Sequence, residues 1–312
     1  MAPAFVHRDR NTVCVIDASC PLGVSLVKRL LKRGYTVHAA SYTYGQSINL
    51  GVAGKSTCSN LKKLASDNRR LKLFEADPFD YKSIIDAVKG CAGLFYTFEL
   101  PPGDSYDELM VEGEVRSAHN ALEACAQVET IERIVFTSSV TAVVWDDNRK
   151  LPDHVVEKDW SDPNFCRKFK LWHALAKTLA EKTAWALAMD RDVDMISVNA
   201  GLLTGPELSV TNPYLKGTQQ MYENGVLVTV DVDFLVNAHI AVYENPSAYG
   251  RYLCFNNVIC HPHDAVKFVQ MLSPNASCLP PSDDLRVIKP RIQNRKLNEL
   301  MVEFDAGTNL EA

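Results

Sequence analysis

Three side chains in the middle of the chain have the types and the spacing for proton transfer. Ser139 directly follows a predicted apolar strand over 133–138, and His173 and Lys177 lie four residues apart in a predicted helix over 165–187. Side chains four residues apart are neighbours on a helix surface. A free imidazole titrates at about pH 6.5, which suits proton transfer near neutrality. The neighbouring Lys177 ammonium is expected to favour the neutral ring, which is the poorer proton donor.

The helix over 165–187 is the clearest in the sequence because its apolar residues form one stripe at helical spacing. The members of the stripe are Phe165, Phe169, Trp172, Ala176 and Leu179. His173 and Lys177 lie on the adjoining face, so packing of the stripe is expected to position both side chains.

Short apolar runs alternate with helical patterns through the first two hundred residues. The predicted strands cover 12–17, 35–40, 71–76, 93–97, 133–138 and 194–199, and the main predicted helices cover 21–32, 107–126 and 165–187. Continuous apolar strands separated by helices indicate a parallel sheet covered on both faces. The fold class is therefore α/β, a Rossmann-type doubly wound parallel sheet, with its ligand crevice at the carboxyl ends of the strands.

The alternation weakens beyond Gly205 and Pro206. We expect a Rossmann domain over 10–200, with the chain partly returning to it at 225–245, and a smaller lobe over 201–312 that closes over the crevice. A hydrophobic content of 46% with 23% charged residues is ordinary for a protein with a sizeable core.

The composition argues against several classes of partner. A net charge of −5 without a basic run gives no electrostatic case for nucleic acid or an anionic membrane. The nine cysteines lack metal-ligand spacing, so we expect no metal site and mostly reduced thiols. The N-terminus has no apolar leader segment and no later stretch is long enough to span a membrane. We therefore expect a cytoplasmic protein.

Segments spread along nearly the whole chain resemble one family. They include 13–23, 32–37, 75–77, 93–97, 133–139, 199–206, 238–240 and 250–254. These segments resemble the extended short-chain dehydrogenase/reductases of plants, and within them the cinnamoyl-CoA reductase and dihydroflavonol reductase family. By this resemblance the chain is identified as a divergent cinnamoyl-CoA reductase-like member.

The resemblance assigns catalytic roles to the three side chains. In the family a Tyr gives a proton to the carbonyl oxygen, a Lys binds the nicotinamide ribose, and a Ser holds the carbonyl. These roles fall on His173, Lys177 and Ser139, so His173 stands where the Tyr is expected. An imidazole is shorter than a phenol, so His173 would relay the proton directly or through one water. Alternatively, His173 only packs or forms hydrogen bonds there, and Ser139 and Lys177 persist for folding or ribose binding.

The resemblance also locates a phosphate-binding turn after the first strand. The family motif Thr-Gly-x-x-Gly-x-x-Gly lets the backbone approach the diphosphate closely. Here the glycine positions hold Asp17, Cys20 and Gly23, and Pro21 suits the first turn of the following helix. The Cys20 side chain would project toward the diphosphate, and Asp17 adds a carboxylate unless it accepts a hydrogen bond from a ribose hydroxyl. Weakened cofactor affinity and normal binding both remain open.

The cofactor implied by the resemblance is NADPH, with NAD not excluded. The family's NADP-dependent members carry an Arg after the second strand and NAD-dependent enzymes carry an acid, whereas this chain has His38 and Tyr42. The implied cofactor contacts are Asp17, Ser19, Cys20, Pro21, Leu22, Gly23, Tyr42, Asp77, Thr97, Lys177, Ala200 and Leu203, and the segment 97–99 would line the ribose on the nicotinamide side.

Two functions follow from the resemblance. The first is an NADPH-dependent oxidoreductase acting on a carbonyl or thioester of a phenylpropanoid-type small molecule. The segment after Pro206 is shorter than in cinnamoyl-CoA reductases and lacks their His-x-x-Lys, which counts against a bulky CoA thioester. The second is a catalytically impaired homologue that acts as a nucleotide-binding or protein-interacting regulator, which leaves a protein partner open.

Two further groups of polar residues have simpler interpretations. Glu108, Glu112 and Glu114 are predicted to form a solvated helix face. His261 and His263 are predicted to belong to a loop entering a helix rather than to a metal site.

Overall fold

The computed structural model describes residues 11–42, 61–100, 106–146, 154–206, 208–273 and 287–308. Its centre is a seven-stranded, fully parallel sheet in the order β3-β2-β1-β4-β5-β6-β9. The strands are β1 Thr12–Ile16, β2 Thr36–Ser41, β3 Leu71–Glu75, β4 Gly93–Tyr96, β5 Arg133–Ser139, β6 Met195–Ala200 and β9 Gly250–Cys254. The predicted Rossmann-type doubly wound fold is confirmed. The predicted loop from 43 to 60 lies outside the described residues.

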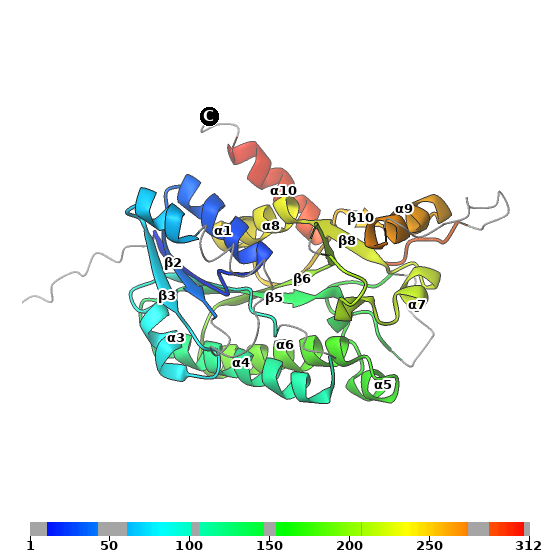
Figure 1. Ribbon diagram of the computed structural model, residues 1–312, viewed down its shortest axis with the longest axis horizontal. Coiled ribbons are helices and arrows are strands. Elements are labelled where there is room, and N and C mark those ends of the chain that lie inside the picture. Colours follow the sequence, from blue (N-terminus) through cyan, green and yellow to red (C-terminus); the bar gives the residue numbers. More distant parts are fainter. Residues whose placement is uncertain are drawn as a thin grey trace, which may run out of the picture.

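Helices cover both faces of this sheet (Figure 1). One face carries α1 (Pro21–Lys32), α8 (Val232–Glu244) and α10 (Arg295–Thr308), and the other carries α3 (Tyr81–Val88), α4 (Glu108–Ala126) and α6 (Trp172–Asp190). Each face encloses its own cluster of buried apolar side chains. The sheet is therefore buried on both sides, which is why its strands read as continuous apolar runs.

A second, three-stranded sheet in the order β10-β8-β7 lies at one end of the main sheet (Figure 1). It consists of β7 (Leu202–Thr204), β8 (Val228–Asp231) and β10 (Asn257–Val258), and the short elements around it are α5 (Pro163–Lys168), η2 (Pro213–Leu215), α7 (Thr218–Glu223) and α9 (Pro262–Leu272). Between these pieces the chain returns to the main sheet as β9. The division into domains at about residue 200 stays a prediction.

The first strand–turn–helix unit forms for reasons visible in the sequence. Pro21 occupies the first helical position of α1, where its missing N–H is not needed. Leu22, Leu26 and Leu30 are buried on one stripe of the helix. Gly34, with φ of 97°, lets the chain turn after the helix into β2. The predicted bounds of α1 are confirmed.

The predicted helix over 165–187 is wrong in one respect, because it is two helices. α5 ends at Lys168 and α6 begins at Trp172, with Lys170 between them in the left-handed conformation at φ of 53°. The N–H of Leu171 donates to the Cys166 carbonyl at 2.8 Å and that of Lys170 donates to Arg167 at 3.1 Å, which is a Schellman ending. The break places His173 in the first turn of α6.

No helix in the described segments has both the length and the apolar character needed to cross a bilayer.

Candidate functional site

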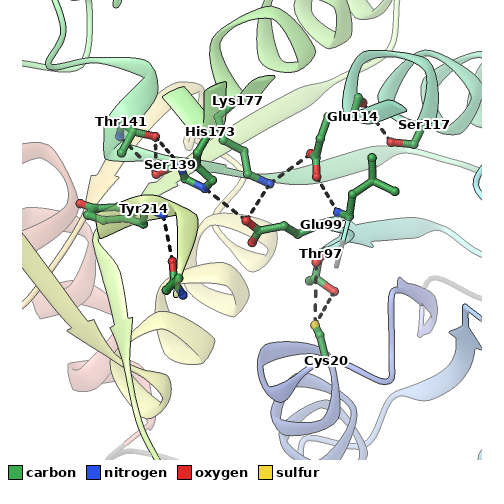
Figure 2. A network of polar contacts seen from close by, with 12 residues as sticks. Cys20, Thr97, Glu99, Glu114, Ser117, Ser139, Thr141, His173, Lys177 and Tyr214 are labelled. Atoms are coloured by element: carbon green, nitrogen blue, oxygen red, sulfur yellow. Dashed lines mark hydrogen bonds and ion pairs between the residues drawn. The ribbon is translucent and has the colours of Figure 1, made fainter. Parts of the chain in front are cut away.

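The three predicted catalytic residues lie together at the carboxyl end of β5 (Figure 2). Ser139 is the last residue of β5, and His173 and Lys177 face it from the first two turns of α6. Thr141 connects two of them. Its Oγ1 donates to Ser139 Oγ at 3.0 Å and lies 3.1 Å from His173 Nδ1. Ser139, Thr141, His173 and Lys177 are all buried.

Glu99 lies between His173 and Lys177 and joins them. Its Oε1 is 3.2 Å from His173 Nε2 and 3.8 Å from Lys177 Nζ. Desolvation opposes the charge of this carboxylate, but Lys177 and His173 lower the pKa of Glu99 to about 2. Its side chain is 48% exposed, so it borders solvent on the open side of the site. The spacing of His173 and Lys177 along the helix does not reveal this carboxylate, because Glu99 lies far away in the sequence.

Glu114 is not on a solvated helix face, so that prediction is wrong. It is 2% exposed, and its carboxylate accepts from Lys177 Nζ at 3.2 Å and from the Leu100 N–H at 2.6 Å. Glu108 and Glu112 are exposed as predicted. Glu114 follows the same helical phase as the other buried positions of α4, which are Val111, Ser117, Ala118, Ala121, Leu122, Ala124 and Cys125. This phase is the sequence signal that could have identified it.

Lys177 is held as a cation by the two carboxylates. Burial opposes its charge, but Glu114 and Glu99 raise the pKa of Lys177 above its ordinary value. Burial also raises the pKa of Glu114, against the attraction of Lys177. An ammonium that is stabilised in this way can bind a hydroxyl oxygen, but it is a poor source of protons.

The phosphate turn uses its own polar groups internally. The Asp17 carboxylate accepts from the Ser19 N–H at 2.8 Å, from the Ser19 hydroxyl, and from the Tyr42 N–H at 3.4 Å. Burial raises the pKa of Asp17, and the bonds from Ser19 and Tyr42 oppose that shift. Asp17 therefore organises the ends of β1 and β2, and the two N–H groups that it occupies are not free for a ligand.

Cys20 caps α1 and fills the turn. Its Sγ accepts from the Gly23 N–H at 3.2 Å and contacts the Asp17 carbonyl oxygen at 3.2 Å and Thr97 Oγ1 at 3.5 Å (Figure 2). Burial raises the pKa of Cys20 to about 12, so the thiol is neutral. A Cβ on Gly23 would lie 2.0 Å from the Asp17 carbonyl oxygen, so only glycine fits there.

The strand–turn–helix unit of β1 and α1 has the arrangement of a dinucleotide-binding turn. It offers fewer backbone N–H donors to a diphosphate than this fold usually does. A diphosphate is normally bound by the N–H groups at the N-terminus of the first helix. Pro21 has no N–H and Gly23 gives its own to Cys20. Among the first three residues of α1, only Leu22 keeps an N–H without a partner in the described part of the chain.

The remaining predicted cofactor contacts lie along the same carboxyl edge of the sheet, but not in one cluster. Thr97 follows β4 and its hydroxyl donates to the Asp17 carbonyl at 2.9 Å. Tyr42 packs edge-on against Phe98. Asp77 is exposed beyond β3, where its carboxylate accepts from a turn N–H of its own segment. Further along the edge are Ala200, which ends β6, and Leu203 in β7.

A pocket of about 350 Å³ opens beside His173. Its lining residues are Tyr106, Trp172, His173, Val210, Thr211, Asn212, Pro213, Leu215 and Lys216. The rings of Tyr106 and Tyr214 lie 5.9 Å and 5.8 Å from the His173 ring. Among the described residues, the buried Tyr106 hydroxyl has no hydrogen-bond partner. The pocket thus combines aromatic side chains with this hydroxyl and the exposed Lys216.

Glu181, one turn beyond Lys177 on α6, is a buried charge that the sequence analysis missed. It is fully buried and pairs with Arg251 Nε at 2.8 Å. It also accepts from Ser138 Oγ, Ser197 Oγ and Asn199 Nδ2, each at 2.7 Å. This pair connects α6 with β5, β6 and β9 beneath the site.

No cluster of metal ligands occurs among the described residues. His261 caps α9 and His263 lies in its first turn, as predicted for a loop entering a helix.

Comparisons with known proteins agree with the fold. Cinnamoyl-CoA reductase 1 of Petunia hybrida is 36% identical, over 94% of this chain and 88% of the relative. Tetraketide alpha-pyrone reductase 1 of Arabidopsis thaliana is 32% identical, over 96% and 88%. The crystal structure of vestitone reductase from alfalfa superposes with a TM-score of 0.69 at 25% identity, over 93% of this chain and 91% of that one. No protein-family model matches.

A further solved structure, yeast Gre2 complexed with NADPH, has a TM-score of 0.71 at 17% identity, covering 93% of both chains, and supports the fold alone. The curated relatives decide the family. The chain belongs to the cinnamoyl-CoA reductase-like family of extended short-chain dehydrogenase/reductases, of which it is a divergent member.

Proposed function

We propose that this protein is a cytosolic, NAD(P)H-dependent reductase of a carbonyl on a phenylpropanoid-type small molecule, with NADPH preferred. The observation that carries this proposal is the meeting of Ser139, His173 and Lys177 beside an aromatic-lined pocket. The family supports it, because the relatives are named as reductases of cinnamoyl-CoA and of tetraketide alpha-pyrones.

The chain's own residues have distinct roles in this reaction. When bound, a dihydronicotinamide would supply the hydride for the carbonyl carbon. Lys177 has three N–H donors, of which one bonds Glu114, and it would bind the ribose hydroxyls with the donors that remain. Ser139 would hold the carbonyl oxygen, and His173 would provide the proton that this oxygen needs.

The pocket favours a small aryl substrate over a CoA thioester. Its volume of about 350 Å³ lies at the small end of the range of about 300–1,000 Å³ that is typical of small-molecule sites. Trp172 and Tyr106 line the pocket and would contact an aromatic group, and Lys216 would offer a charge to a polar substituent. Val210 to Lys216 come from the segment beyond residue 200, which we propose to be the substrate lobe.

Titration with NADPH and NADH, followed by turnover of an aryl aldehyde, tests the proposal. We expect binding to be tightest for NADPH, with loss of reduced-nicotinamide absorbance when the aldehyde is added. Ser139→Ala should lower turnover about 100-fold because it removes a donor to the reacting oxygen. Ser66→Ala, an exposed serine, serves as the matched control and should not change it. Dissociation constants above about 1 mM for both nucleotides would exclude the reductase function.

A second candidate function is supported by the phosphate turn. Asp17 and Cys20 occupy N–H groups that a diphosphate would use, so nucleotide binding is expected to be weak or unproductive. Such binding would suit a regulator better than an enzyme. Saturable binding of NADPH without turnover of any aldehyde would favour this candidate, including one that acts through a protein partner.

A further inference from the structure

Both ring nitrogens of His173 already have protein partners, so neither is free for a substrate oxygen (Figure 2). Nε2 lies 3.2 Å from Glu99 Oε1, and Nδ1 lies 3.1 Å from Thr141 Oγ1. The residue is 7% exposed, which leaves little room for the ring to turn outward. A proton held by His173 must therefore leave through one of these two partners.

The direction of each bond follows from counting protons. Thr141 Oγ1 has one proton and donates it to Ser139 Oγ, so toward His173 it can only accept. The Glu99 carboxylate, whose pKa is lowered to about 2 by Lys177 and His173 against its desolvation, can also only accept. The hydrogen-bond pattern thus assigns a proton to both ring nitrogens.

We propose that His173 is held as an imidazolium and that Thr141 passes its proton to Ser139, whose hydroxyl delivers a proton to the carbonyl oxygen. The inference deepens the proposed reductase function and rests on it. Thr141 acts through its neighbours as a positioning residue, whereas Ser139 is the group that touches the substrate.

Ser139 is suited to be the delivering end of this relay. Its Oγ accepts from both the Thr141 N–H, at 3.2 Å, and the Thr141 hydroxyl, at 3.0 Å. No bond runs from the Ser139 hydroxyl proton to another residue in the described ranges. Because Ser139 Oγ accepts two hydrogen bonds, its own hydroxyl becomes a better proton donor. The hydroxyl proton remains available to a ligand.

The groups around the His173 ring compensate for the positive charge that its second proton adds. The groups that face it are Glu99 after β4, Lys177 on α6, and two phenols, Tyr106 and Tyr214. Burial raises the pKa of both phenols, so they stay neutral. With Glu114 behind Lys177, two carboxylates then face two cations, and a buried cluster without net charge costs less than one with an uncompensated ion.

The step balances in atoms and electrons. When the carbonyl carbon gains a hydride, which a bound dihydronicotinamide would supply, the C=O electron pair moves onto oxygen. That oxygen bonds the proton of Ser139 Oγ, which takes the Thr141 proton, and Thr141 takes the proton of His173 Nδ1. The imidazole that remains is neutral and keeps its Nε2–H on Glu99. After the alcohol leaves, pocket water returns one proton along the same two hydroxyls.

Nitrogen-15 NMR of the histidine rings in the full-length protein tests the protonation state without any turnover. The His173 signals are assigned from their loss in His173→Gln. We expect both nitrogens to be protonated at neutral pH in the wild-type protein and the ring to become neutral in Glu99→Gln. A neutral His173 ring in the wild-type protein would overturn the proposal, whether or not the protein reduces a carbonyl.

Kinetics of Thr141 variants test the relay itself. Thr141→Val removes the connecting hydroxyl and Thr141→Ser keeps it. Thr178→Val is the matched control, because Thr178 is a buried threonine whose hydroxyl donates only to the Ala174 carbonyl of its own helix. We expect kcat to fall at least about tenfold in Thr141→Val, with NADPH affinity unchanged, and to recover in Thr141→Ser. The control should retain the wild-type kcat.

A folded Thr141→Val protein with the wild-type kcat would show that the proton takes another route, and the relay would be wrong. If the wild-type protein reduces no aldehyde while NMR shows the imidazolium, the reductase function and the delivery step fail, and only the protonation assignment stands. The two failures are therefore distinguishable.

Discussion

Two buried ionic clusters lie one turn apart on α6, and they differ in how completely their charges are satisfied. Around Glu181, Arg251 and three neutral donors make five hydrogen bonds to one fully buried carboxylate. Around Lys177, two carboxylates share one ammonium, and one of them, Glu99, borders solvent. The first cluster has no capacity left for a ligand, whereas the second does.

The difference indicates separate roles for two adjacent stretches of the same helix. A fully satisfied buried network fixes the positions of the elements that supply it. Here those elements are β5, β6 and β9, the strands on which Ser139 depends. A partly open network keeps charged groups available to a substrate or cofactor. The cluster of Glu181 and Arg251, here called the closed cluster, therefore fixes the positions of these strands. The cluster of Lys177, Glu99 and Glu114, here called the open cluster, belongs to the candidate site.

Breaking the closed cluster should have the largest effect. Arg251→Met leaves the Glu181 carboxylate buried without its cation, so we expect the free energy of unfolding to fall by about 3–5 kcal/mol. Urea unfolding measures this. In the control, Arg191→Met removes a more exposed pair with Glu123 and should cost about 1 kcal/mol or less. Equal losses in the two variants would show that the closed cluster has no special structural role.

Breaking the open cluster should affect function more than stability. Lys177→Met leaves Glu114 buried, but this carboxyl already has a raised pKa and can take up a proton, so we expect a loss of about 1–3 kcal/mol. NADPH affinity should fall at least about tenfold, because an ammonium bonded to the ribose is lost. Lys182→Met, on the exposed side of α6, is the control. Unchanged NADPH affinity in Lys177→Met would place the cofactor elsewhere.

The acid stability of the protein should report on Glu99. Its pKa is lowered from 4.5 to about 2 in the folded state, so its contribution is present above about pH 4.5 and is lost as pH falls toward 2. We expect Glu99→Gln to flatten this part of the stability profile, measured by urea unfolding at a series of pH values. The exposed Glu108→Gln variant should follow the wild-type profile. A Glu99→Gln profile as steep as that of the wild-type protein would argue against the ion pair.

The smallest effect is expected at the phosphate turn. Cys20→Gly releases the Gly23 N–H from the thiol and should increase NADPH affinity by a few-fold, about what one additional hydrogen bond contributes. Isothermal titration of NADPH measures the change, with Cys260→Ala as a control distant from the turn. Weaker binding in Cys20→Gly would mean that the thiol supports the cofactor rather than displacing it.

The sequence predicted most of the central sheet and the first helix. Six of the seven sheet strands and the bounds of α1 follow from apolar runs and end signals, because these patterns are local. The break at Lys170 was not predictable in the same way, because a lysine rather than a glycine adopts the left-handed ending.

The candidate site was predictable only in part. His173 and Lys177 follow from spacing along one helix, but Glu99 comes from the segment after β4, more than seventy residues earlier in the chain, and meets them only in the folded structure. Glu114 and Glu181 read as ordinary charged helix residues unless their helical phase is compared with that of the buried stripe. Buried charges oppose composition rules, so a sequence pattern alone underestimates them.

His173 is, in this mechanism, the source of the proton that Thr141 and Ser139 pass on, and not the remnant of a lost site. The most direct test compares NADPH-dependent reduction of an aryl aldehyde by the wild-type protein and by His173→Tyr. We expect turnover by the wild-type protein and at least a tenfold loss in His173→Tyr, because the larger phenol cannot keep the bonds to both Glu99 and Thr141. An inactive wild-type protein that gains activity in His173→Tyr would contradict this role of His173.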